Sequence, residues 1–438
     1  MSLESARPAL TRLETWLVAL LLLMPFLSKI TLRALGLPDR FGLIWWQGGL
    51  HPVMNSVLTT GLLFALGILF IRRSPSSTSR EKIYLSVLIA FMAVMGVQAI
   101  LQAAFQDLNV NLLLHFSGLA LTSLLIFGYG WLVPRLGAVG TLFQLLTVTV
   151  RVLLAVSFLI LLLRPEFAFK GSRFIGVFKH IPYMVTCAQL GLLVEWNNIV
   201  SRCGWRRVLA GFFLMLAWVG IALTGTRSAA LCGLVFLLLA AYKWPIKSEG
   251  MTWLRRGLVY LSLVFAVTLG PFAASALESF LRGESSFLLR PAQDGIASRL
   301  EEVERGWATV EKSPLLGQGL LYRFGSESME TAGSYNSFRD PHNIFVSAGV
   351  IGGWPLIIVL SLALGSLGAF LISRLRGPVR GQEDYQVLLL SIYLLSHLPI
   401  LLVYHLHLSL GGLADRIYWL FMGCVFSART AKSSEEHV

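Results

Sequence analysis

The sequence predicts an all-α protein that crosses a membrane about twelve times. Hydrophobic residues make up 55% of its 438 residues and charged residues only 13%. The mean hydropathy of +0.71 is well above what the core of a soluble protein requires. Twelve apolar stretches each approach the roughly 20 residues that a membrane-spanning helix needs. They lie near 13–32, 50–71, 83–105, 110–131, 141–163, 179–198, 206–224, 227–246, 253–275, 342–373, 385–405 and 407–428.

The basic residues indicate how these helices are oriented. Short cytoplasmic loops of membrane proteins carry an excess of Lys and Arg. If the N-terminus is cytoplasmic, the five inner loops hold 15 of these residues, against 8 in the short outer loops. We therefore expect a multi-pass protein with both termini in the cytoplasm. Much of the net charge of +13 then comes from the Lys and Arg residues that orient the helices in the membrane.

The spacing of the apolar stretches divides the chain into four parts. Residues 1–275 hold the first nine predicted helices, and 276–341 form a small helical domain on the outer side, before the tenth span. Residues 342–428 hold the last three helices, and 429–438 form a cytoplasmic tail. The outer domain carries ten acidic and seven basic residues, so its bulk charge does not favour an anionic ligand. An anion site there must come from the placement of individual side chains.

The composition disfavours several classes of site. No basic stripe alternates with aromatic residues in a soluble module, as nucleic-acid binding would require. The four cysteines are not spaced like zinc ligands. No Asp-x-Asp pair in an outer loop could hold a divalent ion beside a diphosphate. We therefore expect the bilayer as a partner, but no nucleic acid, no metal and no cofactor.

Two arginines are predicted to open helices at the outer face. Ser298 with Glu301 fits a capping box, which puts Arg299 in the first helical turn. The apolar residues of this helix recur at helical spacing: Ile296, Leu300, Val303, Trp307 and Val310. Thr226 can cap the helix that Arg227 opens. Because a helix N-terminus offers free N–H groups and partial positive charge, an arginine there favours an anion. The alternative is a surface arginine that pairs with a lipid or an acid.

A histidine is predicted at the start of the tenth span. Asp340-Pro341-His342 fits a capping residue, a proline at the first helical position and a histidine at the second. The helix dipole disfavours a charged imidazolium at that end, so we expect His342 to be neutral at pH 7 and able to accept a proton. The alternative is a histidine that only satisfies the helix end by hydrogen bonding. Asp415 and Arg416, near the outer face in the last span, form a further candidate pair.

Five short motifs follow one another along the chain. They are Arg173-Phe-Ile-Gly-Val-Phe-Lys-His180, Thr224-Gly-Thr-Arg-Ser228, Ser298-Arg299 followed by Trp307, Pro314-Leu-Leu-Gly-Gln-Gly319, and His342-Asn-Ile-Phe345 ending in Gly349-Val-Ile-Gly352. In their order and their position before the last three spans, they resemble the bacterial O-antigen ligase and O-antigen polymerase superfamily. The resemblance covers residues 171–191 and 222–355.

This resemblance implies a bacterial inner-membrane enzyme whose active site faces the periplasm. Ligases of this kind transfer a glycan from undecaprenyl diphosphate to the lipid A–core oligosaccharide in lipopolysaccharide biosynthesis, whereas polymerases join lipid-linked repeat units. Carried over by position, His342 is the catalytic base. Arg227, Arg299 and Arg173 are the residues that hold the diphosphate or its sugar. The supporting candidates are Asp340, Asn343, Asp415 and Arg416.

We favour a ligase over two alternatives, although no single motif separates it from the first of them. An O-antigen polymerase would use similar residues on a different acceptor. A secondary transporter or flippase would place polar residues at mid-membrane between two similar halves. Here they gather at the predicted outer face, and only the second half of the chain holds a large outer domain. We therefore expect a metal-independent, inverting glycosyltransferase that uses a histidine base.

Overall fold

A computed structural model describes part of the chain. It covers residues 110–170, 173–243, 297–318, 343–379, 381–398 and 413–427, together with Ile30, the pairs 40–41 and 45–46, and scattered positions between 86 and 104. This part is mostly helical, which confirms the predicted helical class. The predicted spans 13–32, 50–71, 83–105 and 253–275 lie wholly or mostly outside the described residues.

The helices follow the apolar stretches of the sequence closely. Their bounds are α4 Val110–Arg135, α5 Val139–Leu163, α6 Pro165–Ala168, α7 Ile181–Ser201, α8 Trp205–Thr224, α9 Arg227–Tyr242, α11 Ala297–Lys312, α12 Ile344–Arg376, α13 Gln382–His397 and α14 Leu413–Ser427. Two antiparallel pairs of short strands accompany them, β1 Arg40–Phe41 with β2 Trp45–Trp46 and β3 Phe169–Lys170 with β4 Arg173–Phe174. Within the described residues, α5, α8 and α12 are long and apolar enough to cross a membrane. Two shorter apolar segments are Ser228–Tyr242 in α9 and Arg416–Ser427 in α14.

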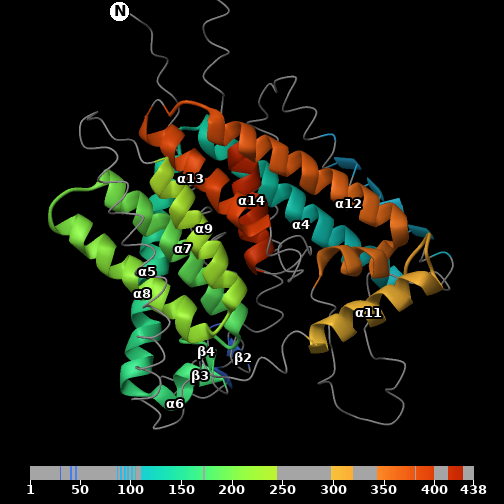
Figure 1. Ribbon diagram of the computed structural model, residues 1–438, viewed down its shortest axis with the longest axis horizontal. Helices are drawn as coiled ribbons and strands as arrows, with labels where there is room; N and C mark the ends of the chain where they lie inside the picture. The colour runs from blue at the N-terminus through green and yellow to red at the C-terminus, as the bar shows by residue number, and fades with distance from the viewer. Residues whose placement is uncertain are drawn as a thin grey trace, which may run out of the picture.

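Helix α7 lies at the centre of the bundle (Figure 1). Every residue from Met184 to Asn198 is buried, on all sides of the helix. It contacts α5, α8, α9, α13 and α14. Trp196 donates from its Nε1 to the hydroxyl of Tyr385 in α13 at 3.0 Å. A long, mainly apolar helix that is buried on every side is typical of the interior of a large bundle.

Helices α4 and α14 pack backbone against backbone. A Cβ atom added at Gly130 would meet the carbonyl oxygen of Leu420, and one added at Gly423 would meet that of Phe127. Between membrane helices there is little hydrophobic driving force, so close approach at small residues supplies much of the packing energy. The two glycines therefore fix this pair of helices.

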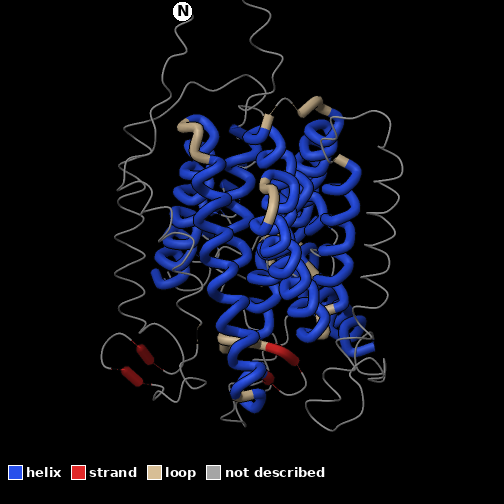
Figure 2. The backbone as a smooth tube through the Cα atoms, turned by 90° about the vertical axis from the view of Figure 1, so that its left-hand side faces the viewer, coloured by secondary structure: helices blue, strands red, loops and turns tan. Residues whose placement is uncertain are grey.

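The helix ends predicted to share a side of the membrane lie together. The hairpin β3–β4 lies at the lower end of the bundle in Figure 1, and α11 lies at the lower right, below α12; Figure 2 shows strands at the lower end from a second direction. Three hydrogen bonds join helix ends predicted to be cytoplasmic: Arg135 to Ser427 at 3.2 Å, Arg374 to the carbonyl of Val425 at 3.0 Å, and Gln382 to Asn197 at 3.0 Å. This is the arrangement that alternating membrane crossings require.

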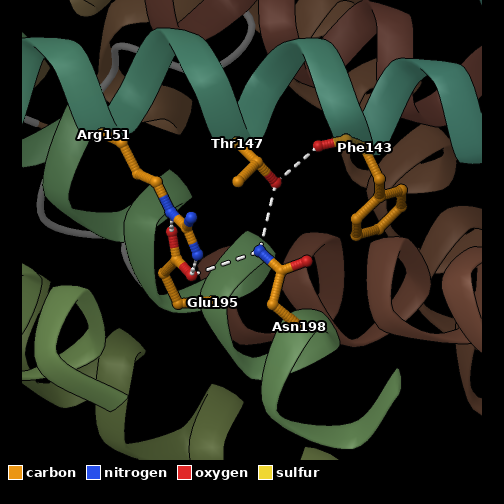
Figure 3. Close-up of polar contacts among 5 residues, drawn as sticks. All are labelled: Phe143, Thr147, Arg151, Glu195 and Asn198. Carbon is orange, nitrogen blue, oxygen red and sulfur yellow. Dashed lines mark hydrogen bonds and ion pairs between the residues drawn. The ribbon is translucent and has the colours of Figure 1, made fainter. Parts of the chain in front are cut away.

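A partly buried ion pair joins α5 to α7 (Figure 3). Arg151, near the middle of α5, donates from Nε and Nη2 to the two carboxylate oxygens of Glu195, both at 2.7 Å. Asn198 donates to the same carboxylate at 3.1 Å and to Thr147 at 3.3 Å. The guanidinium carbon lies 5.2 Å from the ring centre of Phe213 in α8. Charged side chains within membrane helices are costly unless they are paired, as Arg151 and Glu195 are here. The pair therefore constrains how α5, α7 and α8 pack.

Replacing Arg151 by methionine should destabilise the protein more than replacing Glu195 by methionine. The Glu195 side chain is fully buried, whereas 24% of Arg151 is exposed, so the carboxylate left alone has less access to water than the guanidinium left alone. Removing one partner of a buried pair typically costs about 3–5 kcal/mol, and replacing both by apolar residues costs far less. Unfolding of both single variants and the double variant in detergent micelles measures this. A double variant less stable than Arg151→Met would contradict the prediction.

Candidate active site at one end of the bundle

Strand β4 presents Arg173 at the lower end of the bundle. Phe174, the next residue, is fully buried and packs against Phe158 of α5, with ring centres 5.4 Å apart. Gly176 has φ of +55°, and the amide of Val177 donates to the hydroxyl of Ser157 at 3.1 Å. The alternation of the strand leaves Arg173 half-buried, on the side opposite Phe174. β4 also contacts α7 and α8.

Arg227 is the first residue of α9, as predicted. The turn from α8 to α9 is made by Gly225, whose backbone is left-handed with φ of +64°, a conformation that glycine adopts without strain. Thr226 occupies the N-cap position, but its side chain makes no capping hydrogen bond, which corrects that part of the prediction. Thr224 instead accepts from the amide of Thr226 at 3.4 Å. The N–H groups of the first turn of α9 are therefore not capped by the Thr226 side chain.

Arg299 lies in the first turn of α11, again as predicted. The described helix begins at Ala297, so Ser298 lies inside the first turn and does not occupy the predicted cap position. Val310 is buried and Val303 and Trp307 are partly buried along one stripe, while Leu300 is 57% exposed and does not belong to it. The stripe packs on α12 through a cluster, called here the valine cluster, that consists of Val310, Val346 and Val350.

The start of α12 differs from the prediction. Asn343 is the N-cap, with an extended backbone, and its Oδ1 accepts from the amides of Phe345 at 2.9 Å and Val346 at 3.2 Å. Asn and Asp are equally favoured as N-cap residues. Asp340 therefore does not cap α12, and His342 precedes the cap and is not its second helical residue. His342 and Asp340 themselves lie outside the described residues.

Helix α12 contains a break that the sequence did not predict. Gly352 and Gly353 have non-helical backbone angles, with φ of +66° at Gly353. The Pro314–Gln318 loop, which follows α11, bonds to the backbone on both sides of this break. Pro355 and the two adjacent glycines could have indicated the break, but proline and glycine are both common within membrane helices. The predicted span 342–373 is therefore two helical parts.

The pair Asp415-Arg416 lies at the start of α14. The other end of α14, at Ser427, bonds to Arg135 at the predicted cytoplasmic end of α4. The start of α14 therefore points toward the end of the bundle that carries Arg173 and Arg227. Arg416 is half-buried there.

The sequence-predicted residues thus come from separate elements: β4 lies at the lower left of the bundle in Figure 1, and α11 lies at the lower right, in contact with α12. A family model described as O-Antigen ligase matches residues 211–361. This confirms the resemblance of the chain to the O-antigen ligase family. No curated protein matches the chain.

The match supports a function of the O-antigen ligase or polymerase type, with glycosyltransferase-like activity on lipid-linked glycan at a membrane. The matched region runs from α8 to the second part of α12. It contains Arg227, Arg299 and His342, together with Asp340 and Asn343. Arg173, Asp415 and Arg416 lie outside it.

Proposed function

We propose that this protein is an O-antigen ligase of the bacterial inner membrane that transfers a glycan from undecaprenyl diphosphate to lipid A–core oligosaccharide on the periplasmic side. The observation that carries the proposal is the family match over 211–361, the region that holds Arg227, Arg299 and His342. The packing of α11 on the first part of α12 supports it, because the helix that carries Arg299 then lies beside the helix that follows His342.

In this reaction His342 accepts the proton of an acceptor sugar hydroxyl while that oxygen attacks the anomeric carbon of the donor. The new glycosidic bond forms as the bond from the anomeric carbon to the diphosphate oxygen breaks, and the anomeric configuration inverts. Arg227, Arg299 and Arg173 stabilise the negative charge that builds on the departing diphosphate. In a site with little water, such stabilisation contributes several kcal/mol. The reaction needs no metal, because the arginines neutralise the leaving group.

The supporting residues act on this arrangement. Asn343 fixes the start of α12 by capping it, and so orients the backbone that follows directly after His342. Asp340, three residues before the cap, is a candidate partner for the His342 imidazole. Asp415 and Arg416 supply a second charged pair from the start of α14.

Cells that lack the protein test the proposal and separate it from a polymerase. Loss of a ligase should leave polymerised glycan on undecaprenyl diphosphate and unsubstituted lipid A–core. Accumulation of single lipid-linked repeats would identify a polymerase. Purified protein in proteoliposomes should also convert lipid-linked glycan and lipid A–core into product. Movement of the lipid-linked glycan across the bilayer without product would indicate a flippase.

A further inference from the structure

The break in α12 separates a part that is long enough to cross the membrane from a short part that is not needed for crossing. The second part, residues 354–376, is about 34 Å long at a rise of 1.5 Å per residue, so it spans a bilayer core alone. The first part, residues 344–351, is not needed to cross the membrane. Figure 1 shows that the two parts point in different directions. The break therefore decides where the Asn343 end of α12 lies.

The Pro314–Gln318 loop replaces the helical hydrogen bond that the break removes. In an unbroken helix the amide of Trp354 would donate to the carbonyl of Val350, four residues earlier. Here the Trp354 amide donates to the carbonyl of Pro314 at 2.8 Å, and the Val350 carbonyl accepts from the amide of Gln318 at 2.6 Å. The loop satisfies both groups, so the break costs no unpaired backbone group there.

A glycine in the loop, Gly317, and a glycine in α12, Gly353, leave the space that the loop needs to lie in the break. A Cβ atom at Gly317 would lie 2.5 Å from the amide nitrogen of Gly352. A Cβ atom at Gly353 would meet the carbonyl oxygen of Pro314 and lie 2.8 Å from the carbonyl carbon of Leu315. Both glycines also have positive φ, +69° and +66°, which side chains disfavour. Alanine at either position must push the loop and the helix apart.

Apolar packing extends the contact along α11. Trp307 stacks on Trp354 with ring centres 5.6 Å apart and an angle of 29° between planes. Val310, in the last turns of α11, lies against Gly349, just before the break. Val303 and Trp307 pack on the valine cluster. Both helices therefore run toward the break side by side (Figure 1), and their first turns lie at the far ends.

We propose that the Pro314–Gln318 loop, inserted into the Gly352–Gly353 break, is a backbone clamp that positions the first turn of α11 against the start of α12. Through the clamp, Gly317 and Gly353 set how the first turn of α11, which carries Arg299, lies against Asn343, the cap of α12 that follows His342. They are positioning residues, because neither touches the substrate. The catalytic consequence rests on the proposed function, but the geometry of the clamp does not.

Distance measurement tests the geometry without any activity. Spin labels at Leu300→Cys in α11 and Leu362→Cys in the second part of α12 report how α11 sits on the membrane helix, since both positions are more than half exposed. Cys203, the exposed native cysteine, is first replaced by serine, and the other three are buried. Gly353→Ala and Gly317→Ala should each broaden or shift the distance distribution. Gly365→Ala is the matched control, because a Cβ there meets nothing within 4 Å.

Kinetics of the same glycine variants, without labels, test the consequence for transfer. A displacement of about 1 Å at a reacting centre can cost about 10²-fold in rate. We expect kcat to fall by that order in Gly353→Ala and Gly317→Ala, with a smaller change in KM for the donor, and no change in Gly365→Ala. Gly317→Ala lies in the loop outside α12, so it remains informative if Gly353→Ala fails to fold.

Each outcome decides one part of the proposal. Distance distributions that match the Gly365→Ala control in both variants would overturn the clamp. Altered distances with unchanged kcat would overturn its role in positioning the site. Absence of transfer by the unmodified protein would contradict the proposed function, while the distances would still judge the clamp.

Discussion

Replacement of His342 by alanine should lower the rate of glycan transfer by about 10²–10⁴-fold, the usual contribution of a positioned general base. The acceptor hydroxyl would then have to lose its proton to water as it attacks. Donor affinity should change little, because the arginines proposed to hold the diphosphate are untouched. Steady-state rates with lipid-linked donor and lipid A–core, alongside direct donor binding, measure the two effects separately.

His342→Gln distinguishes a base from a residue that only bonds to the helix end. A glutamine amide can still donate and accept hydrogen bonds near Asn343, but it cannot take up a proton. Both variants should therefore be slow if His342 is the base. Near-normal transfer by His342→Gln, with expression and folding verified, would assign the histidine a structural role and require another base.

The sequence was sufficient to predict those helices whose ends are set by their own run of apolar residues. The predicted spans at 141–163 and 206–224 agree with α5 and α8 to within two residues, because each apolar run ends at charged residues or at glycine. Arg227 and Arg299 were likewise placed in first turns correctly. These features are local, and local rules of length and charge determine them.

Features that depend on distant partners were not predictable. The run around Gly352 and Gly353 is apolar enough to continue as one helix, and it breaks where the Pro314–Gln318 loop supplies other hydrogen-bond partners. Arg151 was visible within a span, but its partner Glu195 lies 44 residues away. The cap of α12 was misjudged for a different reason. Asp340 and Asn343 are equally good caps, and the proline between them favoured the wrong one.

Replacement of Arg299 or Arg227 by alanine should reduce both the rate of transfer and the affinity for the donor. Each guanidinium is proposed to contact the diphosphate in the bound donor and to stabilise it further as it departs. Loss of one such donor from a preorganised site typically costs about 10²–10³-fold in kcat. Lysine should restore little of this, because a single ammonium group cannot form the paired hydrogen bonds of a guanidinium with phosphate oxygens.

Arg305→Ala is the matched control for Arg299→Ala, because Arg305 lies in the same helix, is exposed and pairs with Glu301 one turn away. An exposed pair of this kind contributes little to stability, so Arg305→Ala should transfer glycan at the normal rate. The electrostatic role also predicts that added salt weakens donor binding by the parent protein more than by either arginine variant. If Arg299→Ala and Arg227→Ala bound the donor as tightly as Arg305→Ala does, the arginines would not hold the diphosphate. The stabilisation of the leaving group would then have to come from elsewhere at this end of the bundle, with Arg173 and Arg416 the next residues to replace.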